Sequence, residues 1–452
     1  MAQKSLISDF TKGNITKQLV VFSAPLFLSS LLQVVYNMVD MVIVGHQLGK
    51  VGLSAVAVGG DVSNFLTFIS MGFGNAGQVI ISQYIGAGKH HKIGKFISTM
   101  FTFLMSCAVI LSILCLVFRH PILKVMNTPA ESFDQALAYS TICMGGSVFI
   151  YGYNIMSAVL RGLGDAKHPF VFICVSAILN IMLDVLFVIV MDAGAGGAAL
   201  ATVISQAVSF FSCCIFLYVK RRHLGFEISL KDFKSLDKAM LMSLIKLGVP
   251  MAIKSASVHI SKLFVNSYIN SFGVAVSAFA GIANKVNSIA ILFSNSLNTA
   301  GSSMVGQNIG AGEYKRVTKI IGRIFVITLS IAVIMSAIVV AFPKPLFGLF
   351  TDDVPVLDIA LEYVPVAVVV FFAAAFRSAM NGLINGSGNY KVNFATAIFD
   401  GIIMRIGLSL LFGVAAGMGY FGFWLGDALA GFTPFFVGVV FYFSGKWKKK
   451  TV

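Results

Sequence analysis

The stretch "QYIGAGKHHKIGKFI", residues 83–97, recurs as "QNIGAGEYKRVTKII" at residues 307–321. The two copies start at Gln83 and Gln307, so they are 224 positions apart. The same shift superposes "LRGLGDAKHPF" (160–170) on "INGSGNYKVNF" (384–394). A shift that persists over such distances indicates an internal duplication, because unrelated segments do not realign at one fixed offset. The sequence therefore predicts two homologous halves.

Composition places both halves in a membrane. Of the 452 residues, 57% are hydrophobic and only 11% are charged, and the mean hydropathy is +0.89. The apolar runs are roughly 20 to 25 residues long, which suits a helix crossing about 30 Å of hydrocarbon and not the ten-residue alternating strands of a barrel. An all-α polytopic membrane protein follows.

We expect twelve transmembrane helices, six in each half. The expected spans are 17–44, 54–82, 95–118, 136–160, 169–191, 195–219, 240–269, 277–305, 319–342, 357–382, 393–414 and 418–443. Both copies of the repeated loop fall on the same side of the membrane, so the halves have the same orientation. They are expected to be related by a pseudo-two-fold axis along the membrane normal, as in rocking-bundle transporters.

The domain organisation follows from these spans. Residues 1–219 form an N-terminal six-helix lobe, residues 220–239 a polar cytoplasmic linker, and residues 240–452 a C-terminal six-helix lobe. The first apolar run is too long for the core of a cleavable signal, so it is expected to remain as a helix.

Basic residues set the expected orientation. The loops on one side hold only Lys50, Arg119, Lys124 and Lys344, whereas the other loops and both termini hold most of the Lys and Arg. The positive-inside rule then places both termini and the central linker in the cytoplasm, with the protein in the inner (plasma) membrane. The net charge of +15 is explained by the membrane, so no nucleic-acid partner is expected.

Motifs for metals, disulfides and phosphate loops are missing. The six cysteines lie inside apolar runs without CxxC spacing, and no metal site is expected. The "IGAG" copies lack GxxxxGK[ST] and do not follow a strand, so they are interpreted as tight turns between helices. We expect no cofactor apart from a coupling ion, and a monomer in contact with the lipid bilayer and small organic substrates.

Carboxylates inside the apolar runs are the strongest functional candidates. "QVVYNMVDMVIVGHQLG" (33–49) contains Asp40 about six residues from the outer end of the first span. Asp184 and Thr202 lie at a similar depth, roughly 10 Å below the outer surface at 1.5 Å per residue, and Asn180 lies one turn from Asp184 on the same face. A carboxylate in hydrocarbon costs about 2.5–3.5 kcal/mol, so it normally faces a cavity or a partner.

The duplication separates function from common structure at these positions. The shift of 224 carries Asp40 onto Phe264, Asn180 onto Met404 and Asp184 onto Leu408, so the second half lacks the polar set. Two carboxylates in one poorly solvated pocket repel each other and favour uptake of a proton or a small cation. We therefore predict an ion-coupling pocket; the alternative is that neighbouring hydroxyls and amides merely satisfy these carboxylates.

The second half has a basic interior instead. Lys254, Lys262, Lys285 and Arg405 fall in or near apolar runs, and they are candidates for a cavity that contacts an anionic substrate group or a counter-ion. Asp400 precedes Arg405 on the same span, which suggests a local ion pair as the simpler interpretation.

These residues together resemble the multidrug and toxic compound extrusion (MATE) transporters, in particular the bacterial DinF-like branch. The resemblance covers essentially the whole chain and is carried by "SAPLFLSSLLQVVYNMVDMVIVGHQLGKVGLSAV", both "IGAG" loops, "VLRGLGDAKHPF" and "LNIMLD". It implies an antiporter that exports organic, often cationic or amphipathic compounds in exchange for protons or sodium ions.

The resemblance also implies site residues. The ion-coupling positions of the DinF-like branch match Asp40, Asn180, Asp184 and Thr202, with Tyr36, Asn37, Tyr139 and Asn154 as further candidate pocket members. The related NorM-like branch uses acidic residues of spans 7 and 10, for which this sequence offers only Glu362 at the outer end of span 10.

The sequence also bears on two other functions. A flippase for lipid-linked precursors, from the same superfamily, is compatible with the basic second-half interior. A membrane-embedded enzyme is not favoured, because neither HExxH nor GxSxG occurs and His259 is almost the only intramembrane histidine.

Overall fold

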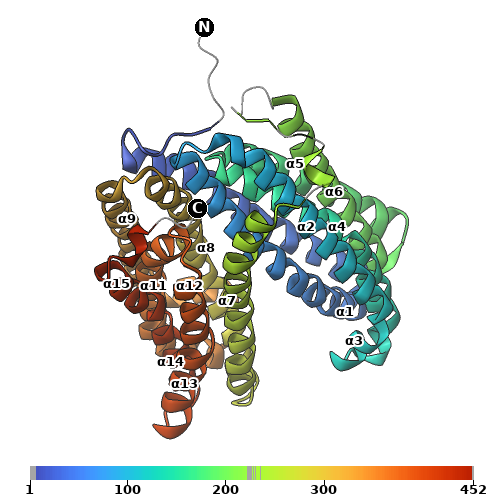
Figure 1. Cartoon of the computed structure of the whole chain (residues 1–452). Helices are drawn as coiled ribbons and strands as arrows, with labels where there is room; N and C mark the ends of the chain where they lie inside the picture. The colour runs from blue at the N-terminus through green and yellow to red at the C-terminus, as the bar shows by residue number, and fades with distance from the viewer. Residues whose placement is uncertain (1–6, 221–225, 228, 230, 235, 450–452) are drawn as a thin grey trace. The chain divides into compact units, whose positions relative to one another are not determined.

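The computed structural model describes residues 7–220, 226–227, 229, 231–234 and 236–449. This part of the chain is helical and contains no strand (Figure 1). The α-helices are α1 (Ile15–Gly86), α2 (His90–Val117), α3 (Arg119–Val125), α4 (Phe133–Gly162), α5 (Lys167–Asp184), α6 (Gly194–Lys220), α7 (Lys238–Asn270), α8 (Val274–Ala311), α9 (Tyr314–Ala341), α10 (Pro343–Gly348), α11 (Val354–Gly386), α12 (Tyr390–Ile398), α13 (Arg405–Leu410), α14 (Gly419–Ala430) and α15 (Thr433–Phe443).

Short helical turns of other types join them. The π-helical turns are η2 (Val185–Val190), η5 (Phe399–Met404) and η6 (Leu411–Ala415), and the 3₁₀ turns are η1 (Ala130–Ser132), η4 (Asp232–Lys234) and η7 (Lys446–Lys448). Part of the predicted linker, namely residues 221–225, 228, 230 and 235, lies outside the described residues.

Helix α1 supplies two membrane spans. It is 72 residues long, which at 1.5 Å per residue far exceeds the roughly 30 Å of hydrocarbon. Gly49 interrupts it with φ 60° and ψ −154°, a conformation that essentially only glycine adopts. The described residues hold eleven segments long and apolar enough to cross a membrane, α1 among them. Counting α1 as two spans gives the predicted twelve.

Two compact units make up the chain. Unit 1 comprises Met1–Asp9 and Leu28–Gly248, and unit 2 comprises Phe10–Phe27 and Val249–Val452. The contacts therefore divide the chain at different points from the lobes 1–219 and 240–452. The first part of α1 packs with unit 2, and the start of α7 packs with unit 1.

Helix α4 forms the centre of unit 1. It packs against both α6 and α2. Small residues allow the close approach to α6, because a Cβ on Gly146 would stand 2.3 Å from Val203 and one on Gly152 would stand 2.6 Å from the Phe210 ring. Replacing either glycine would force these helices apart.

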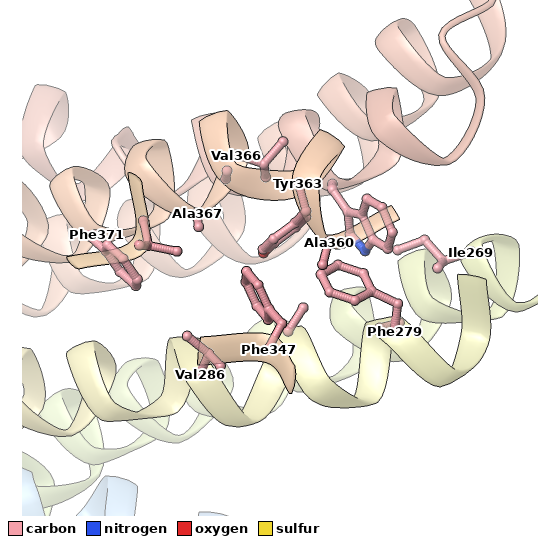
Figure 2. Close-up of a cluster of buried hydrophobic side chains, with 14 of the residues drawn as sticks. Ile269, Phe279, Val286, Phe347, Ala360, Tyr363, Val366, Ala367 and Phe371 are labelled. Atoms are coloured by element: carbon pink, nitrogen blue, oxygen red, sulfur yellow. The ribbon is translucent and has the colours of Figure 1, made fainter. Parts of the chain in front are cut away.

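Unit 2 is organised around α11, which packs against α8 and α9. Figure 2 shows its aromatic core, in which Phe279 of α8, Phe347 of α10 and Tyr363 of α11 converge. The centroid of the Phe279 ring lies 5.3 Å from that of the Phe347 ring and 5.2 Å from that of the Tyr363 ring, and both pairs of rings are arranged edge to face. The Tyr363 hydroxyl accepts a hydrogen bond from Asn287 at 2.7 Å, so its polar end is also satisfied.

The internal repeat is visible in the contacts. A Cβ on Gly77 would meet Met100, and 224 positions later a Cβ on Gly301 would meet Ile324. The helix after the second loop also begins alike in both units: the Asp165 carboxylate accepts from the His168 N–H at 3.1 Å, and the Asn389 carbonyl accepts from the Val392 N–H at 3.2 Å. Equivalent residues thus make equivalent contacts, which confirms the predicted duplication.

The "IGAG" segments are turns, as predicted. Gly88 and Gly312 have φ of 69° and 81°, and they separate α1 from α2 and α8 from α9. These left-handed conformations favour glycine, which explains why both copies carry it.

Candidate functional site

Three polar side chains of unit 1 that the sequence singled out are buried. Asp40 of α1 is 8% exposed, Asn180 of α5 is 2% exposed, and Asp184 at the end of α5 is fully buried. Asn180 and Asp184 are four residues apart on one helix and so lie on the same face. This set of Asp40, Asn180 and Asp184 is referred to below as the carboxylate pocket.

The polar atoms of the carboxylate pocket have few partners. Oδ1 of Asp40, both carboxylate oxygens of Asp184 and both amide atoms of Asn180 are buried without a hydrogen-bond partner among the described residues. Buried polar groups of folded proteins are nearly always paired, and each exception needs an explanation. These five unpartnered atoms on three side chains make the set the candidate binding site of unit 1.

The two carboxylates are close enough for their charges to interact. Tyr139 of α4 lies within electrostatic reach of both, and its ring packs against α1 where a Cβ on Gly59 would stand 2.4 Å away. Asp40, Asp184 and Tyr139 therefore come from three helices to one place. The sequence predicted this convergence from depth alone for the two carboxylates.

Of the remaining candidates, only Tyr36 has an interaction with a carboxylate of the pocket among the described residues. Tyr36 lies one turn before Asp40 and interacts with its charge and with Gln206. Thr202 of α6 is half-buried; its backbone carbonyl accepts from the Ser205 hydroxyl at 2.9 Å. Asn154 of α4 has an unpartnered Nδ2 within the described part of the chain. Asn37 is exposed on the surface of α1.

Backbone irregularity begins directly after the carboxylate pocket. Helix α5 ends at Asp184, and the π-helical turn η2 follows from Val185 to Val190. Such π turns are rare and often occur at functional sites. The repeat places η6 at almost the same position in unit 2, where no carboxylate precedes it. The turn is thus a shared feature of the fold, and the carboxylate is specific to unit 1.

The chemistry of this pocket is that of cation uptake. Adjacent carboxylates without donors repel each other, and a shared proton or a small hard cation relieves the repulsion. Carboxylate and amide oxygens are the ligands that hard cations prefer. Asp40, Asp184 and the Asn180 carbonyl could therefore hold a proton or a sodium ion.

Unit 2 contains a second polar cluster, built from ion pairs. The Arg377 guanidinium donates to Asp400 at 2.9 Å, and Arg405 donates to Asp400 at 3.2 Å and also to Asp427. Asp400 is fully buried, and the Arg405 side chain is 3% exposed. The predicted local ion pair between Asp400 and Arg405 is present, within a longer chain of charges.

Two of the predicted lysines join this cluster. Lys254 of α7 donates to the Asn381 carbonyl of α11 at 2.6 Å and lies within electrostatic reach of Asp400 and Arg377. Lys262 lies within reach of Arg377, Arg405, Asp400 and Asp427. We call Lys254, Lys262, Arg377, Asp400, Arg405 and Asp427 the charge network.

Lys285 lies apart from the charge network. It is exposed on α8, with its ammonium 6.0 Å from the centroid of the Phe350 ring. Arg377, in contrast, belongs to the network although the sequence did not single it out. It follows the apolar run "FFAAAF" near the C-terminal end of its span, where a lone arginine resembles an ordinary flanking residue. The one feature of the sequence that could have indicated its role is that Asn381 lies one turn away on the same span.

The structure offers little support for a metal site or for disulfide bonds among the described residues. Within the described ranges no group of three or more His, Cys, Asp and Glu side chains could hold a metal ion. All six cysteines are free thiols, and Cys143 and Cys213 are buried.

Comparison with known proteins gives a consistent result. The MatE family model matches residues 25–186 and 250–411, one copy in each half. The chain is 29% identical to the "Probable multidrug resistance protein YpnP" of Bacillus subtilis (strain 168), over 97% of both chains. It is 25% identical to the "Probable multidrug resistance protein NorM" of Thermotoga maritima, over 97% of this chain and 94% of the relative.

The fold is also similar to solved structures. The outward-facing conformation of a multidrug resistance MATE family transporter of the MOP superfamily superposes with a TM-score of 0.88, at 23% identity, over 96% of both chains.

Proposed function

Because the chain belongs to the MatE family of membrane transporters, we propose that it exports amphipathic organic compounds, cationic ones among them, from the cell. The relatives named as multidrug resistance proteins support multidrug efflux. The protein is proposed to work as a monomer in the plasma membrane, with both termini in the cytoplasm, since the basic residues gather on that side.

Export is proposed to be antiport with a proton or a sodium ion, bound in the carboxylate pocket. The observation that carries this proposal is the set of orphaned oxygens on Asp40 and Asp184, buried beside each other. An ion entering from outside neutralises the pocket, changes unit 1 and weakens substrate binding. Release of the ion to the cytoplasm restores the affinity, and exchange follows if the empty pocket does not reorient readily.

The test is efflux of a fluorescent organic cation from energised vesicles, under a proton gradient and a sodium gradient imposed separately. Wild type is expected to respond to one gradient, which identifies the ion. Asp40→Asn and Asp184→Asn are expected to lower the driven efflux at least about tenfold, because the coupling energy is lost. Retention of coupled efflux by both variants would overturn the proposal.

Asp192→Asn is the matched control. Asp192 is an exposed carboxylate of the same unit with φ 51°, and asparagine tolerates this left-handed conformation as well as aspartate does. Efflux by this variant is expected to equal that of wild type.

A flippase for lipid-linked precursors is the second candidate, favoured by the charge network of unit 2. Such substrates carry phosphates, which Lys and Arg bind. Translocation of a fluorescent lipid phosphate in proteoliposomes, in the absence of any organic cation efflux, would favour it over multidrug export.

A further inference from the structure

The charge network of unit 2 carries more cations than anions. Its basic members are Lys254, Lys262, Arg377 and Arg405, and its acidic members are Asp400 and Asp427. Four cations against two carboxylates leave two positive charges in excess. In a membrane-spanning segment such an excess is costly unless a partner supplies negative charge.

The ion pairs of the network do not use the ammonium groups of Lys254 and Lys262, which are available to bind a ligand. The terminal nitrogens of Arg405 are taken by Asp400 and Asp427. Lys254 gives one of its three donors to Asn381. Lys262 makes no hydrogen bond or ion pair within the part of the chain that the structure describes. Five ammonium N–H groups of one cluster thus remain for a ligand.

A further donor of the network is buried and unused. The Nε of Arg405 has no partner among the described residues, although Arg405 is only 2% exposed. An orphaned cationic donor at this depth points to an anionic acceptor, by the same reasoning that the orphaned oxygens of unit 1 point to a cation.

The network is also reachable from one end. Asp400 is fully buried, whereas Arg377 is 26% exposed and Lys254 and Lys262 are half-buried. The exposed apolar residues Ile260 and Leu263 lie within one turn of Lys262 on α7. A ligand that meets both kinds of group needs an anionic head and an apolar body.

No common structural role explains the network. The shift of 224 carries Lys254 onto Ser30, Lys262 onto Met38, Arg377 onto Tyr153, Asp400 onto Ser176, Arg405 onto Ile181 and Asp427 onto Val203. Unit 1 has the same fold without any of these charges, so the fold does not require them.

We propose that Lys254, Lys262 and Arg377 bind the anionic oxygen head, a phosphate monoester or a carboxylate, of an amphipathic ligand. This inference rests on the transport function proposed above, and it adds organic anions and zwitterions to the substrates. Asp400 and Asp427 act as positioning residues, because Asp400 holds Arg377 and both carboxylates hold Arg405.

The test is binding of dodecyl phosphate to the protein in phosphatidylcholine nanodiscs, with dodecyltrimethylammonium as the probe of opposite charge and empty nanodiscs as blank. Wild type is expected to bind dodecyl phosphate and to melt at a higher temperature with it. Lys262→Gln and Lys254→Gln are each expected to weaken this binding about tenfold, and the double variant more, with the ammonium probe unaffected.

Two further variants control for charge and for folding. Lys285→Gln removes a lysine of the same unit outside the network and is expected to change nothing. Lys262→Arg keeps the charge and is expected to keep most of the affinity. If the double variant binds dodecyl phosphate as wild type does, or if wild type does not bind it, the anion site is refuted.

The source of the ligand is resolved by the bilayer. The affinity for dodecyl phosphate is measured again in phosphatidylglycerol nanodiscs. If it falls for wild type and not for the double variant, lipid phosphates fill the site. An unchanged affinity would support a site that selects free amphiphiles. The binding assay uses no ion gradient and the efflux assay uses no dodecyl phosphate, so failure of ion-coupled efflux and failure of the anion site are distinguishable.

Discussion

Gly386 lies so close to Ser302 that a Cβ added to it would stand 2.8 Å from the Ser302 carbonyl oxygen. At Gly162, 224 positions earlier, an added Cβ would stand 3.0 Å from the carbonyl oxygen of Gln78. Helix α11 thus touches α8, and α4 touches α1, backbone to backbone. This contact is part of what the duplication has kept in both units.

Gly386→Ala is therefore expected to destabilise unit 2. The obstacle is backbone, which cannot rotate away as a side chain can, so the helices must separate, at a cost of about 1–3 kcal/mol. The melting temperature in detergent, measured by loss of the monodisperse peak, should fall by several degrees. Gly322→Ala is the control, because nothing lies within 4 Å of its Cβ and alanine favours a helix. Equal melting temperatures for both variants would contradict the contact.

Asp184→Asn separates stability from function. Both Asp184 oxygens are buried without partners among the described residues, so the carboxylate contributes little to the fold and its charge is unfavourable there. We expect the variant to melt at or above the wild-type temperature, a gain of up to about 2 kcal/mol, while gradient-driven efflux is lost. A clear fall in melting temperature would instead mean that neighbouring groups satisfy the carboxylate.

Asp237 gives the fold a pH dependence outside the membrane spans. The N–H groups of Met240 and Ala239 donate to its carboxylate at 3.0 Å, and Lys95 lies 3.4 Å away. These contacts, that with Met240 foremost, hold the pKa of Asp237 below its ordinary value. A lowered pKa means stability that is present above the unfolded-state value and is lost as pH falls through the folded one.

Asp237→Asn is expected to lower the melting temperature at pH 7, and the difference from wild type should vanish when the buffer is acidified below the pKa of the folded state. Asparagine caps a helix about as well as aspartate does, so only the charge is lost: its interaction with the helix N-terminus is worth about 0.3–1 kcal/mol, and the partly exposed pair with Lys95 adds less. A melting series from pH 7 to pH 3 measures this. A difference that stays constant over the series would show that the charge of Asp237 is not involved.

Sequence alone accounted for the spans, the duplication and the turns, because each depends on local composition or on a repeat. It also brought Asp40 and Asp184 to one depth, since helical rise converts sequence position into height. The sequence did not assign residues 10–27 to unit 2, because hydropathy identifies a membrane span but not the helices that pack against it. There the Phe10 carbonyl accepts from Arg316 at 2.8 Å and from Asn308 at 3.0 Å, contacts across almost 300 positions that no local pattern indicates.

The geometry of the charge network was harder to predict for a different reason. Asp400 and Arg405 are five residues apart, which sets them about 140° apart around an α-helix. The π-helical turn η5, Phe399–Met404, has its hydrogen bonds at five-residue spacing and so brings them to one side. No residue type marks a π turn, so this pairing becomes clear only in the structure.

Arg405 is the residue on which the network depends, because it alone bridges both carboxylates. Arg405→Met would remove the ion pair of Asp427 and leave Asp400 paired with Arg377 only. Breaking a buried pair in this way costs about 3–5 kcal/mol, so we expect poor yield and a large fall in melting temperature. Arg405→Lys should recover little of it, since one ammonium does not reproduce a planar fork with two carboxylates. The double variant Arg405→Met/Asp427→Asn also removes the carboxylate that loses its ion pair and keeps the pair of Arg377 with Asp400, so it should melt higher than Arg405→Met. If Arg405→Lys melts as wild type does, the fork geometry is not what holds the network together.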